Sequence, residues 1–542
     1  MSANRPACRR AGSRISLTRF YFPVEDAMSF RSVSSLIAAV AMTVAAARGF
    51  AQSAPKVGPP NGTVIVVGGG SMGPEIYKRF IDAAGGPNAL IIDVPTAGGD
   101  SVYNQNAPGT RGWKQAGAKN VYVLHSYDRK LVDSDSFAAI LRKAGGVWFE
   151  GGRQFHLVDA YAGTKTEQGF HDVLARGGVI GGSSAGASII GSFLVRGAPS
   201  NNNFIMDSPG YEKGFAFLRG VGIDQHVVAR ERLPDLADSI MPKYPDLLAI
   251  SEDEGTAWVV KGDVAEIIGR NKAFVYGGKD ATDSGKPFLT LHPGDKYDLA
   301  ARRVVHRASD DSPVSVAFVD SLFKKYSDQT LGGATVLVAQ GGEVFIDKSY
   351  GIPEQARYMP TTTVPQFALG GIGEVFSAIC AQVPEPPARG NRGGDSTARR
   401  GRGGAAATPS TPFQTCVSGR LSTPIGMHKT NATADGQVHS DVDELYRLEL
   451  GLENSRTFVR DTTSGDSNGA GHSFDAARGW QADTYHGVSR LSAFGLPGGM
   501  RSAFVRIPEK RASIIILTGD DSAAAKVMAD RITDQLLAAK KR

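Results

Sequence analysis

Short apolar runs alternate with amphipathic stretches through the first part of the chain. Continuous apolar runs bounded by glycine or proline are typical of strands buried on both faces of a sheet, whereas a period near 3.6 predicts helices. Strands are predicted over 63–67, 89–94, 121–124 and 146–149, and helices over 74–84 and 135–144. This alternation predicts an α/β fold with a mostly parallel sheet sandwiched by helices.

Glycine-rich loops follow the predicted strands. They lie at 68–73, 95–100, 150–154 and 181–187. Because ligands bind beyond the carboxyl ends of parallel strands, we expect these loops to meet at one edge of the sheet. The glycines at 68–70 lack the spacing of a dinucleotide-binding loop and the acidic residue that should follow it, which argues against NAD.

The loop at 181–187 has the features of a nucleophile elbow. Its sequence is Gly-Gly-Ser-Ser-Ala-Gly-Ala, and Ser-Ile-Ile at 188–190 after it predicts the start of a buried helix. Small residues on both sides of one serine permit the tight, strained turn that presents a nucleophile. We predict Ser184 as the nucleophile; the alternative is a glycine- and serine-rich loop with no chemistry.

A serine needs a base to take its proton, and histidine is the usual base. His226 ends the cluster at 222–226, which follows an apolar, glycine-punctuated segment, and it is the candidate; it could also be a structural histidine in a polar loop. Asp224 and Glu254 are both candidates for a third, acidic member. The backbone N–H groups of Ala185 and Gly152 are the candidate donors to an oxyanion.

Polar side chains near the predicted serine and histidine suggest a substrate pocket. Gln154 follows paired glycines and can orient a substrate by its amide. Asp224 and Gln225 offer hydrogen-bonding groups beside the histidine, while Arg230 and Arg232 offer donors to an anion.

The chain divides into two predicted units, over 55–307 and 312–540. A segment rich in proline, glycine, arginine and alanine at 384–412 interrupts the second unit and cannot bury enough apolar surface to order itself. Antiparallel hairpins are predicted for 256–260 with 264–268 and for 334–339 with 343–346, then a strand over 513–517 and a helix over 523–537.

The net charge of +6 is small for 542 residues. Nucleic-acid binding usually needs a concentrated basic face, so we expect no nucleic-acid partner. The Arg-Gly-rich run at 389–394 is read as a solvated linker rather than an RNA-binding segment. Cys380 and Cys416 bracket the low-complexity segment, and they either pair in an oxidising compartment or stay as two buried free thiols.

The first residues predict a targeting segment. An apolar run spans 36–47, and Gly49-Phe50-Ala51 resembles a cleavage site with small residues at both ends. These features predict a signal peptide over 1–51, with Met28 as an alternative start and an uncleaved anchor as the alternative reading. The run is too short to span a membrane stably, so we expect a secreted or periplasmic protein.

Residues from about 60 to 305 resemble the cyanophycinase group of S51 serine peptidases. The motifs that carry the resemblance are Gly-Gly-x-Gln at 151–154, Gly-Ser-Ser-Ala-Gly-Ala at 182–187, Asp-Gln-His with Arg-x-Arg at 224–232, and an acidic Thr-Ala motif at 252–257. The resemblance implies a fold like that of class I glutamine amidotransferases and a serine–histidine mechanism without metal or cofactor. It implies Ser184 as nucleophile and His226 as base.

The same resemblance implies a peptide substrate. The group cleaves cyanophycin, a chain of aspartates that carry arginines on side-chain amides, and releases β-Asp-Arg dipeptides. It implies a substrate pocket formed by Gln154, Asp224, Gln225, Arg230 and Arg232. The chain departs from this family pattern at two positions. Position 153 is arginine where an acidic or amide residue is usual, and position 235 is aspartate where a third arginine is expected.

The second unit resembles the serine β-lactamase and penicillin-binding-protein group. Pro-Ile-Gly-Met at 424–427 and Leu-Pro-Gly-Gly at 496–499 carry the resemblance. The catalytic residues are missing, because Gly-Ile-Gly-Glu at 371–374 stands where Ser-x-x-Lys belongs and Ser-Ala-Phe at 492–494 where His/Lys-x-Gly belongs. We expect a degenerate α+β domain used for packing, substrate holding or dimerisation.

The expected function is that of a secreted serine exopeptidase acting on cyanophycin. The two departures from the family pattern leave open another isoaspartyl or acidic peptide as the substrate. A catalytically inactive binding protein is the alternative from a different class. An active β-lactamase or esterase is a weaker third reading.

Overall fold

The computed structural model describes most of the chain after the predicted signal segment. The described residues are 56–200, 202–283, 285–327, 333–351, 367–383, 410–453, 477–495, 502–519 and 524–538. The predictions for 1–51, for 384–409 and for the motif at 496–499 lie outside them. In the described part of the chain, no helix is long and apolar enough to cross a membrane.

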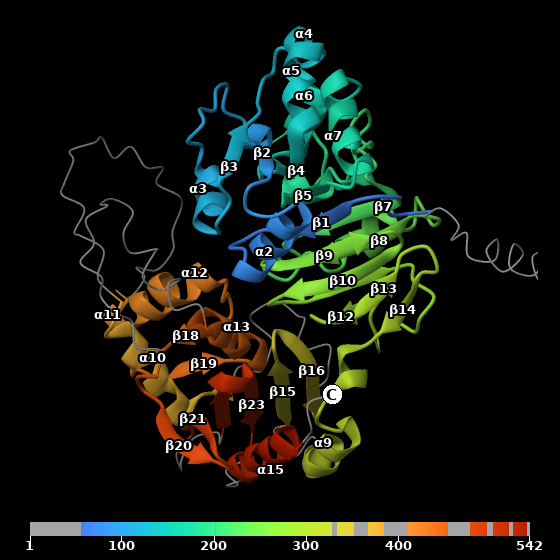
Figure 1. Ribbon diagram of the computed structural model, residues 1–542. Helices are drawn as coiled ribbons and strands as arrows, with labels where there is room; N and C mark the ends of the chain where they lie inside the picture. Colours follow the sequence, from blue (N-terminus) through green and yellow to red (C-terminus); the bar gives the residue numbers. More distant parts are fainter. Residues whose placement is uncertain are drawn as a thin grey trace, which may run out of the picture. The chain divides into compact units, whose positions relative to one another are not determined.

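A nine-stranded mixed sheet forms the centre of the N-terminal part, residues 56–307 (Figure 1). Strands β1, β5, β4, β2 and β3 run parallel, and β9, β10, β13 and β14 extend the sheet in antiparallel pairs. In spatial order the strands are β14 (Arg303–His306), β13 (Lys296–Asp298), β10 (Val264–Gly269), β9 (Thr256–Lys261), β1 (Thr63–Val67), β5 (Val179–Ser183), β4 (Ala144–Phe149), β2 (Leu90–Val94) and β3 (Asn120–Val123). The fold is mixed α/β, as predicted, and the predicted hairpin at 256–268 supplies the antiparallel extension.

Apolar clusters cover both faces of this sheet. Along β1, Val64 and Val66 join one cluster, whereas Ile65 and Val67 join another. Alternate side chains of a strand point to opposite faces, so the continuous apolar run of β1 is buried on both. The helices of this part are α2 (Pro74–Ala83), α3 (Pro108–Gln115), α4 (Arg129–Val132), α5 (Asp135–Ala138), α6 (Gln154–Tyr161), α7 (Lys165–Ala175) and α8 (Ala185–Ser188).

Two predicted helices were wrong in extent. The helix expected over 135–144 is α5 followed by a 3-10 helix over Ala139–Lys143, and Ala144 already pairs with Leu90 in the sheet. The helix expected from 188 onward is the single turn α8, after which the chain enters β6. In both places the helix is shorter than predicted because pairing with neighbouring strands outweighs local helix propensity, which is small for each residue.

A second sheet carries the segment around His226. Its strands, in spatial order, are β12 (Leu289–Leu291), β11 (Ala273–Tyr276), β8 (Leu248–Glu252), β7 (Leu218–Gln225) and β6 (Gly191–Phe193). Strands β6, β7 and β8 are parallel, and Gln225 lies opposite Glu252 at the carboxyl ends of β7 and β8. The residues that follow these two strands therefore leave the sheet side by side.

The C-terminal part, residues 312–538, contains an antiparallel sheet of six strands and a small sheet of three. The strands are β16 (Glu343–Tyr350), β15 (Ala334–Gln340), β23 (Ala512–Thr518), β22 (Ser502–Ile507), β21 (Val488–Phe494) and β20 (Gln481–Tyr485), then β17 (Phe367–Ala368), β19 (Val438–Ser440) and β18 (Asn431–Ala432). The helices are α9 (Val316–Phe323), α10 (Gly373–Cys380), α11 (Pro412–Thr415), α12 (Thr423–Ile425), α13 (Val442–Glu453) and α15 (Ala524–Ala538).

The predicted hairpin at 334–346, strand at 513–517 and helix at 523–537 correspond to β15–β16, β23 and α15. Described residues of both parts belong to one compact unit. The division into domains and the likeness to β-lactamases stay predictions.

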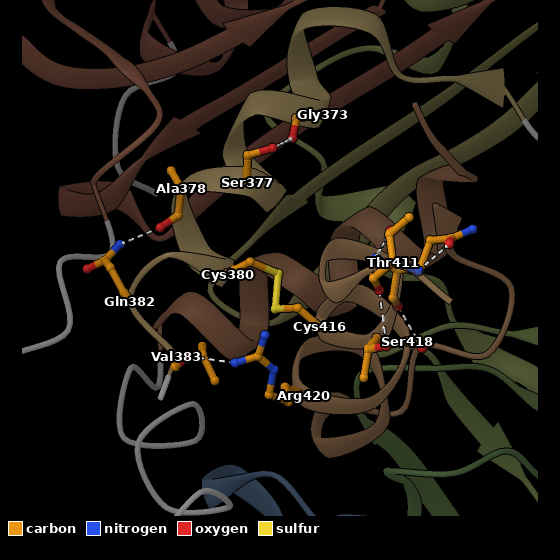
Figure 2. The surroundings of a disulfide bond; sticks show 12 residues. Gly373, Ser377, Ala378, Cys380, Gln382, Val383, Thr411, Cys416, Ser418 and Arg420 are labelled. Carbon is orange, nitrogen blue, oxygen red and sulfur yellow. Dashed lines mark hydrogen bonds between the residues drawn. A yellow bond between two sulfur atoms is a disulfide. The ribbon is translucent and has the colours of Figure 1, made fainter. Parts of the chain in front are cut away.

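A disulfide joins Cys380, the last residue of α10, to Cys416 (Figure 2). The two cysteines are 36 residues apart in sequence, with the low-complexity segment between them. Of the two alternatives that the sequence leaves open, the structure contains the paired one. Arg420 donates a hydrogen bond of 3.0 Å to the carbonyl of Val383 beside the bridge.

Replacing both cysteines, as Cys380→Ser with Cys416→Ser, should lower the free energy of unfolding of the C-terminal part by about 2–4 kcal/mol, because the bridge restricts the unfolded chain. Urea unfolding followed by the fluorescence of Trp480, whose ring centroid lies 4.8 Å from that of Phe504, measures this change. The parent protein with dithiothreitol is the control, and it should lose the same stability. Equal stability of the double variant and the parent would contradict the bridge.

Candidate active site

Ser184 lies at a sharp turn between β5 and α8. Its φ of 58° and ψ of −117° are unfavourable for a residue with a side chain, and such strain is characteristic of functional turns. The neighbours must be small: a Cβ on Gly182 would lie 2.1 Å from the carbonyl oxygen of Gly186, and one on Gly186 would lie 2.0 Å from that of Phe149. The glycines of the motif are therefore required by close backbone approach.

Three side chains form a hydrogen-bonded chain at this turn. Ser184 Oγ lies 2.9 Å from Nε2 of His226, and Nδ1 of His226 lies 2.6 Å from Oε1 of Glu254. His226 directly follows β7, and Glu254 follows β8 by one residue, Asp253. The parallel pairing of β7 with β8 thus brings the histidine and the carboxylate together.

The protonation of this chain follows from the state of Glu254. Burial alone would raise the pKa of Glu254, but hydrogen bonds from His226 and His428 outweigh burial and hold the pKa well below its usual range. An ionised carboxylate only accepts hydrogen bonds, so Nδ1 of His226 carries the proton. Nε2 is then free to accept the hydroxyl proton of Ser184, which is the arrangement of an activated serine.

Asp224, the other acid considered for this position, has a different partner. Nε and Nη2 of Arg196 donate to its two carboxylate oxygens at 2.8 and 2.7 Å, and both side chains are buried. The same Nη2 lies 2.6 Å from Oδ2 of Asp235. Arg196 thus pairs with two acidic side chains. One of them is Asp235, which stands where the family pattern has arginine.

The two arginines predicted for the pocket differ in burial. Arg230 is exposed, whereas Arg232 is buried and lies 3.5 Å from the carbonyl oxygen of Gln225. Burial, followed by the charge of Arg196, lowers the pKa of Arg232 to about 10. Arg232 therefore keeps its positive charge at neutral pH.

The two predicted pocket amides converge on one hydroxyl. Nε2 of Gln154 and Nε2 of Gln225 both lie 3.5 Å from Oγ of Ser188, and all three residues are buried. Gln154 begins α6, Gln225 ends β7 and Ser188 ends α8, so the amides come from different elements. Arg153, directly before Gln154, is half-buried.

The predicted convergence of the loops is confirmed by their contacts. A Cβ on Gly69 would lie 2.1 Å from Cε1 of His226, and one on Gly152 would lie 2.0 Å from the carbonyl oxygen of Ala97. A Cβ on Gly151 would lie 3.3 Å from Cβ of Ser184, so Gly151 is the glycine of the pair beside the serine. The assignment of the Gly152 and Ala185 N–H groups to an oxyanion site stays a prediction.

Sequence reasoning missed two residues at this site, Arg196 and His428. His428 follows α12 in the C-terminal part, and its Nε2 lies 3.2 Å from Oε2 of Glu254. It adjoins the motif at 424–427, which carries the resemblance to β-lactamases. No local pattern marks either residue, although two unpaired acids in one predicted pocket are a reason to search for an arginine.

The positions where the predicted resemblance expects β-lactamase catalytic motifs lie in a turn, a helix and a strand. Residues Gly370–Ile372 form a 3-10 turn, Gly373 begins α10, and Ser492 to Phe494 end β21. Ser492 is buried, and its hydroxyl lies 3.5 Å from the carbonyl oxygen of Gln481 on the neighbouring strand.

Comparison with known proteins shows what the N-terminal part is similar to. Residues 64–268 match the model of peptidase family S51, which confirms the resemblance expected for about 60–305.

The relatives it resembles include named cyanophycinases. One from Geminocystis herdmanii is 29% identical over 234 residues, which cover 41% of this chain and 84% of the relative. Another, from Trichormus variabilis, is 27% identical over 269 residues, covering 45% of this chain and 89% of the relative. A solved peptidase from an acI-B1 Actinobacterium is 23% identical over 44% of this chain and 97% of its own, with a TM-score of 0.35, too low to bear on the fold.

The contact between Gly69 and His226 gives a test of the site. Gly69→Ala should slow labelling of Ser184 by a fluorophosphonate about a hundredfold or more, because the new methyl group displaces the imidazole that acts as base. Mass spectrometry of the labelled peptide measures the rate.

Gly86→Ala is the matched control. Gly69 and Gly86 have similar φ values, 102° and 93°, but a Cβ on Gly86 meets nothing within 4 Å. Both variants should lose about 1–2 kcal/mol of stability from the left-handed conformation, and only Gly69→Ala should lose reactivity. Equal labelling of the two variants would show that the imidazole does not activate Ser184.

Proposed function

We propose that the protein is a serine peptidase that hydrolyses cyanophycin and releases β-Asp-Arg dipeptides. The observation that carries the proposal is the chain of hydrogen bonds from Ser184 through His226 to Glu254. The family of residues 64–268 and the names of the relatives support a peptidase reaction.

The proposed reaction is acyl transfer through Ser184. Its Oγ attacks the scissile carbonyl carbon while Nε2 of His226 takes the hydroxyl proton. The N–H groups of Ala185 and Gly152 stabilise the resulting oxyanion. The tetrahedral intermediate then breaks its C–N bond, and the protonated His226 gives its proton to the leaving amine. Water attacks the acyl-enzyme, His226 takes one of its protons, and the acid is released as that proton returns to Ser184.

Charge supports an acidic substrate. Arg230 and Arg232 follow the base within six residues, and guanidinium groups bind carboxylates through paired hydrogen bonds. The amide nitrogens of Gln154 and Gln225 both approach the hydroxyl of Ser188, four residues after Ser184. The aspartate backbone of cyanophycin carries the carboxylates that such a site would select.

The cluster around Arg196 favours a second candidate substrate class. Because Asp224 and Asp235 are already paired with Arg196, they are less suited to bind the arginine of a β-Asp-Arg unit. An isoaspartyl or acidic peptide without arginine is therefore the alternative. A secreted or periplasmic location is also part of the proposal, and the disulfide supports it because such bridges persist in oxidising compartments.

Ser184→Ala should abolish release of β-Asp-Arg from purified cyanophycin, with a loss of at least about a thousandfold, because the residual rate comes only from binding and oxyanion stabilisation. Liquid chromatography with mass spectrometry measures the product. Ser183→Ala, which changes the adjacent serine at the end of β5, should retain activity and is the matched control.

Parallel incubation with isoaspartyl dipeptides that lack arginine separates the two substrate classes. Turnover of these dipeptides without turnover of cyanophycin would replace the proposed substrate by the second one. Turnover of neither substrate, together with no fluorophosphonate labelling, would favour a catalytically inactive binding protein.

A further inference from the structure

The C-terminal part contacts the acidic member of the site. Glu254 uses Oε1 for His226 and Oε2 for His428, at 2.6 and 3.2 Å. His428 is separated from Glu254 by 174 residues in sequence and belongs to the other part of the chain. The carboxylate is therefore held between two imidazoles, one from each part.

A second contact from the same part holds the backbone beside Glu254. Arg447 of α13 is buried, and its Nη2 lies 3.5 Å from Oδ2 of Asp253. It also donates a short hydrogen bond to Oδ1 of Asn271. Nδ2 of Asn271 in turn donates to the carbonyl of Glu254 at 2.6 Å and to Oδ2 of Asp253 at 3.0 Å.

Asp253 connects this arrangement to the base. Its Oδ1 accepts hydrogen bonds from the backbone N–H groups of Val228 and Ala229, at 3.1 and 2.9 Å. These residues lie two and three positions after His226 in sequence. One carboxylate thus ties the segment of the acid to the segment of the base, and Arg447 holds that carboxylate from the C-terminal part.

We propose that His428 is a positioning residue of the active site and that the C-terminal part serves to complete this site. The proposal rests on the proposed function, in which Glu254 orients the base. A carboxylate bound at one oxygen can rotate about its Cγ–Cδ bond, whereas one bound at both oxygens keeps its plane. His428 therefore aligns Oε1 of Glu254 with Nδ1 of His226 and does not touch the substrate.

This role would not need the two motifs that the predicted β-lactamase resemblance finds missing. The positions at 371–374 and 492–494 lack a nucleophile and a base for β-lactamase chemistry. Holding Glu254 and Asp253 requires neither of them. From the C-terminal part it uses His428, which follows α12, and Arg447 of α13.

The test compares the rate at which a fluorophosphonate labels Ser184 in the full chain. His428→Phe should reduce the maximal labelling rate about tenfold, because one hydrogen bond to a charged group is lost, and should leave the half-saturating probe concentration unchanged. His428→Gln should restore the rate to within about threefold, since its amide nitrogen can donate from a similar position. Thermal unfolding of each variant verifies that it is folded.

His292→Phe is the matched control. Nε2 of His292 lies 3.1 Å from Oδ2 of Asp347, which is another histidine–carboxylate contact between the two parts but does not involve Glu254. This variant should be labelled at the parental rate. If it loses as much as His428→Phe, the effect is general docking of the parts and the positioning role is overturned.

A double-mutant cycle tests whether His428 acts through Glu254. In a Glu254→Gln background, His428→Phe should cause no further loss, because coupled residues are not additive. Additive losses, or a parental rate in His428→Phe alone, would overturn the inference and leave the proposed function intact. A parent that is not labelled at all would overturn the proposed function, and this inference with it.

Discussion

The ionised carboxylate of Glu254 is the group on which the site depends. It is largely buried, and an isolated buried charge is costly unless hydrogen bonds compensate it. Two histidines provide this compensation, and in return the carboxylate fixes the proton of His226 on Nδ1. The free Nε2 then faces Ser184. Loss of the negative charge would therefore alter the tautomer, the orientation of the imidazole and the activation of the serine together.

Close backbone approach is the second constraint, and it explains where glycine occurs. A Cβ on Gly68 would lie 2.2 Å from the carbonyl oxygen of Asp253, and the carbonyl of Gly68 accepts a hydrogen bond from the N–H of His226 at 3.0 Å. The loop after β1 thus packs directly on the segments after β7 and β8. Side chains at these positions would separate the serine, the histidine and the carboxylate.

Local sequence patterns predicted the main strands and the serine turn, whereas contacts between distant residues determined which side chains meet at the site. The run at 63–67 and the motif around Ser184 carry their structure in neighbouring residues, so both were found from the sequence. The choice between Asp224 and Glu254 could not be made that way, because both lie near the ends of parallel strands and only the folded chain shows which one faces His226. His428 had no signal, since its contact with Glu254 spans 174 residues.

The charge cluster at Arg196 determines what the pocket can recognise. One guanidinium binds the carboxylates of Asp224 and Asp235, and the bidentate pair with Asp224 is buried, where removing one partner would leave an uncompensated charge. Breaking this pair so that Asp224 could bind a substrate would therefore cost free energy. In the proposed reaction, the positive charges of Arg230 and Arg232 then determine substrate selectivity. They favour substrates with carboxylates over substrates with guanidinium groups. Position 235 is aspartate where the family pattern has arginine. Arg196, which lies between β6 and β7, pairs with Asp235 and supplies a positive charge at this place.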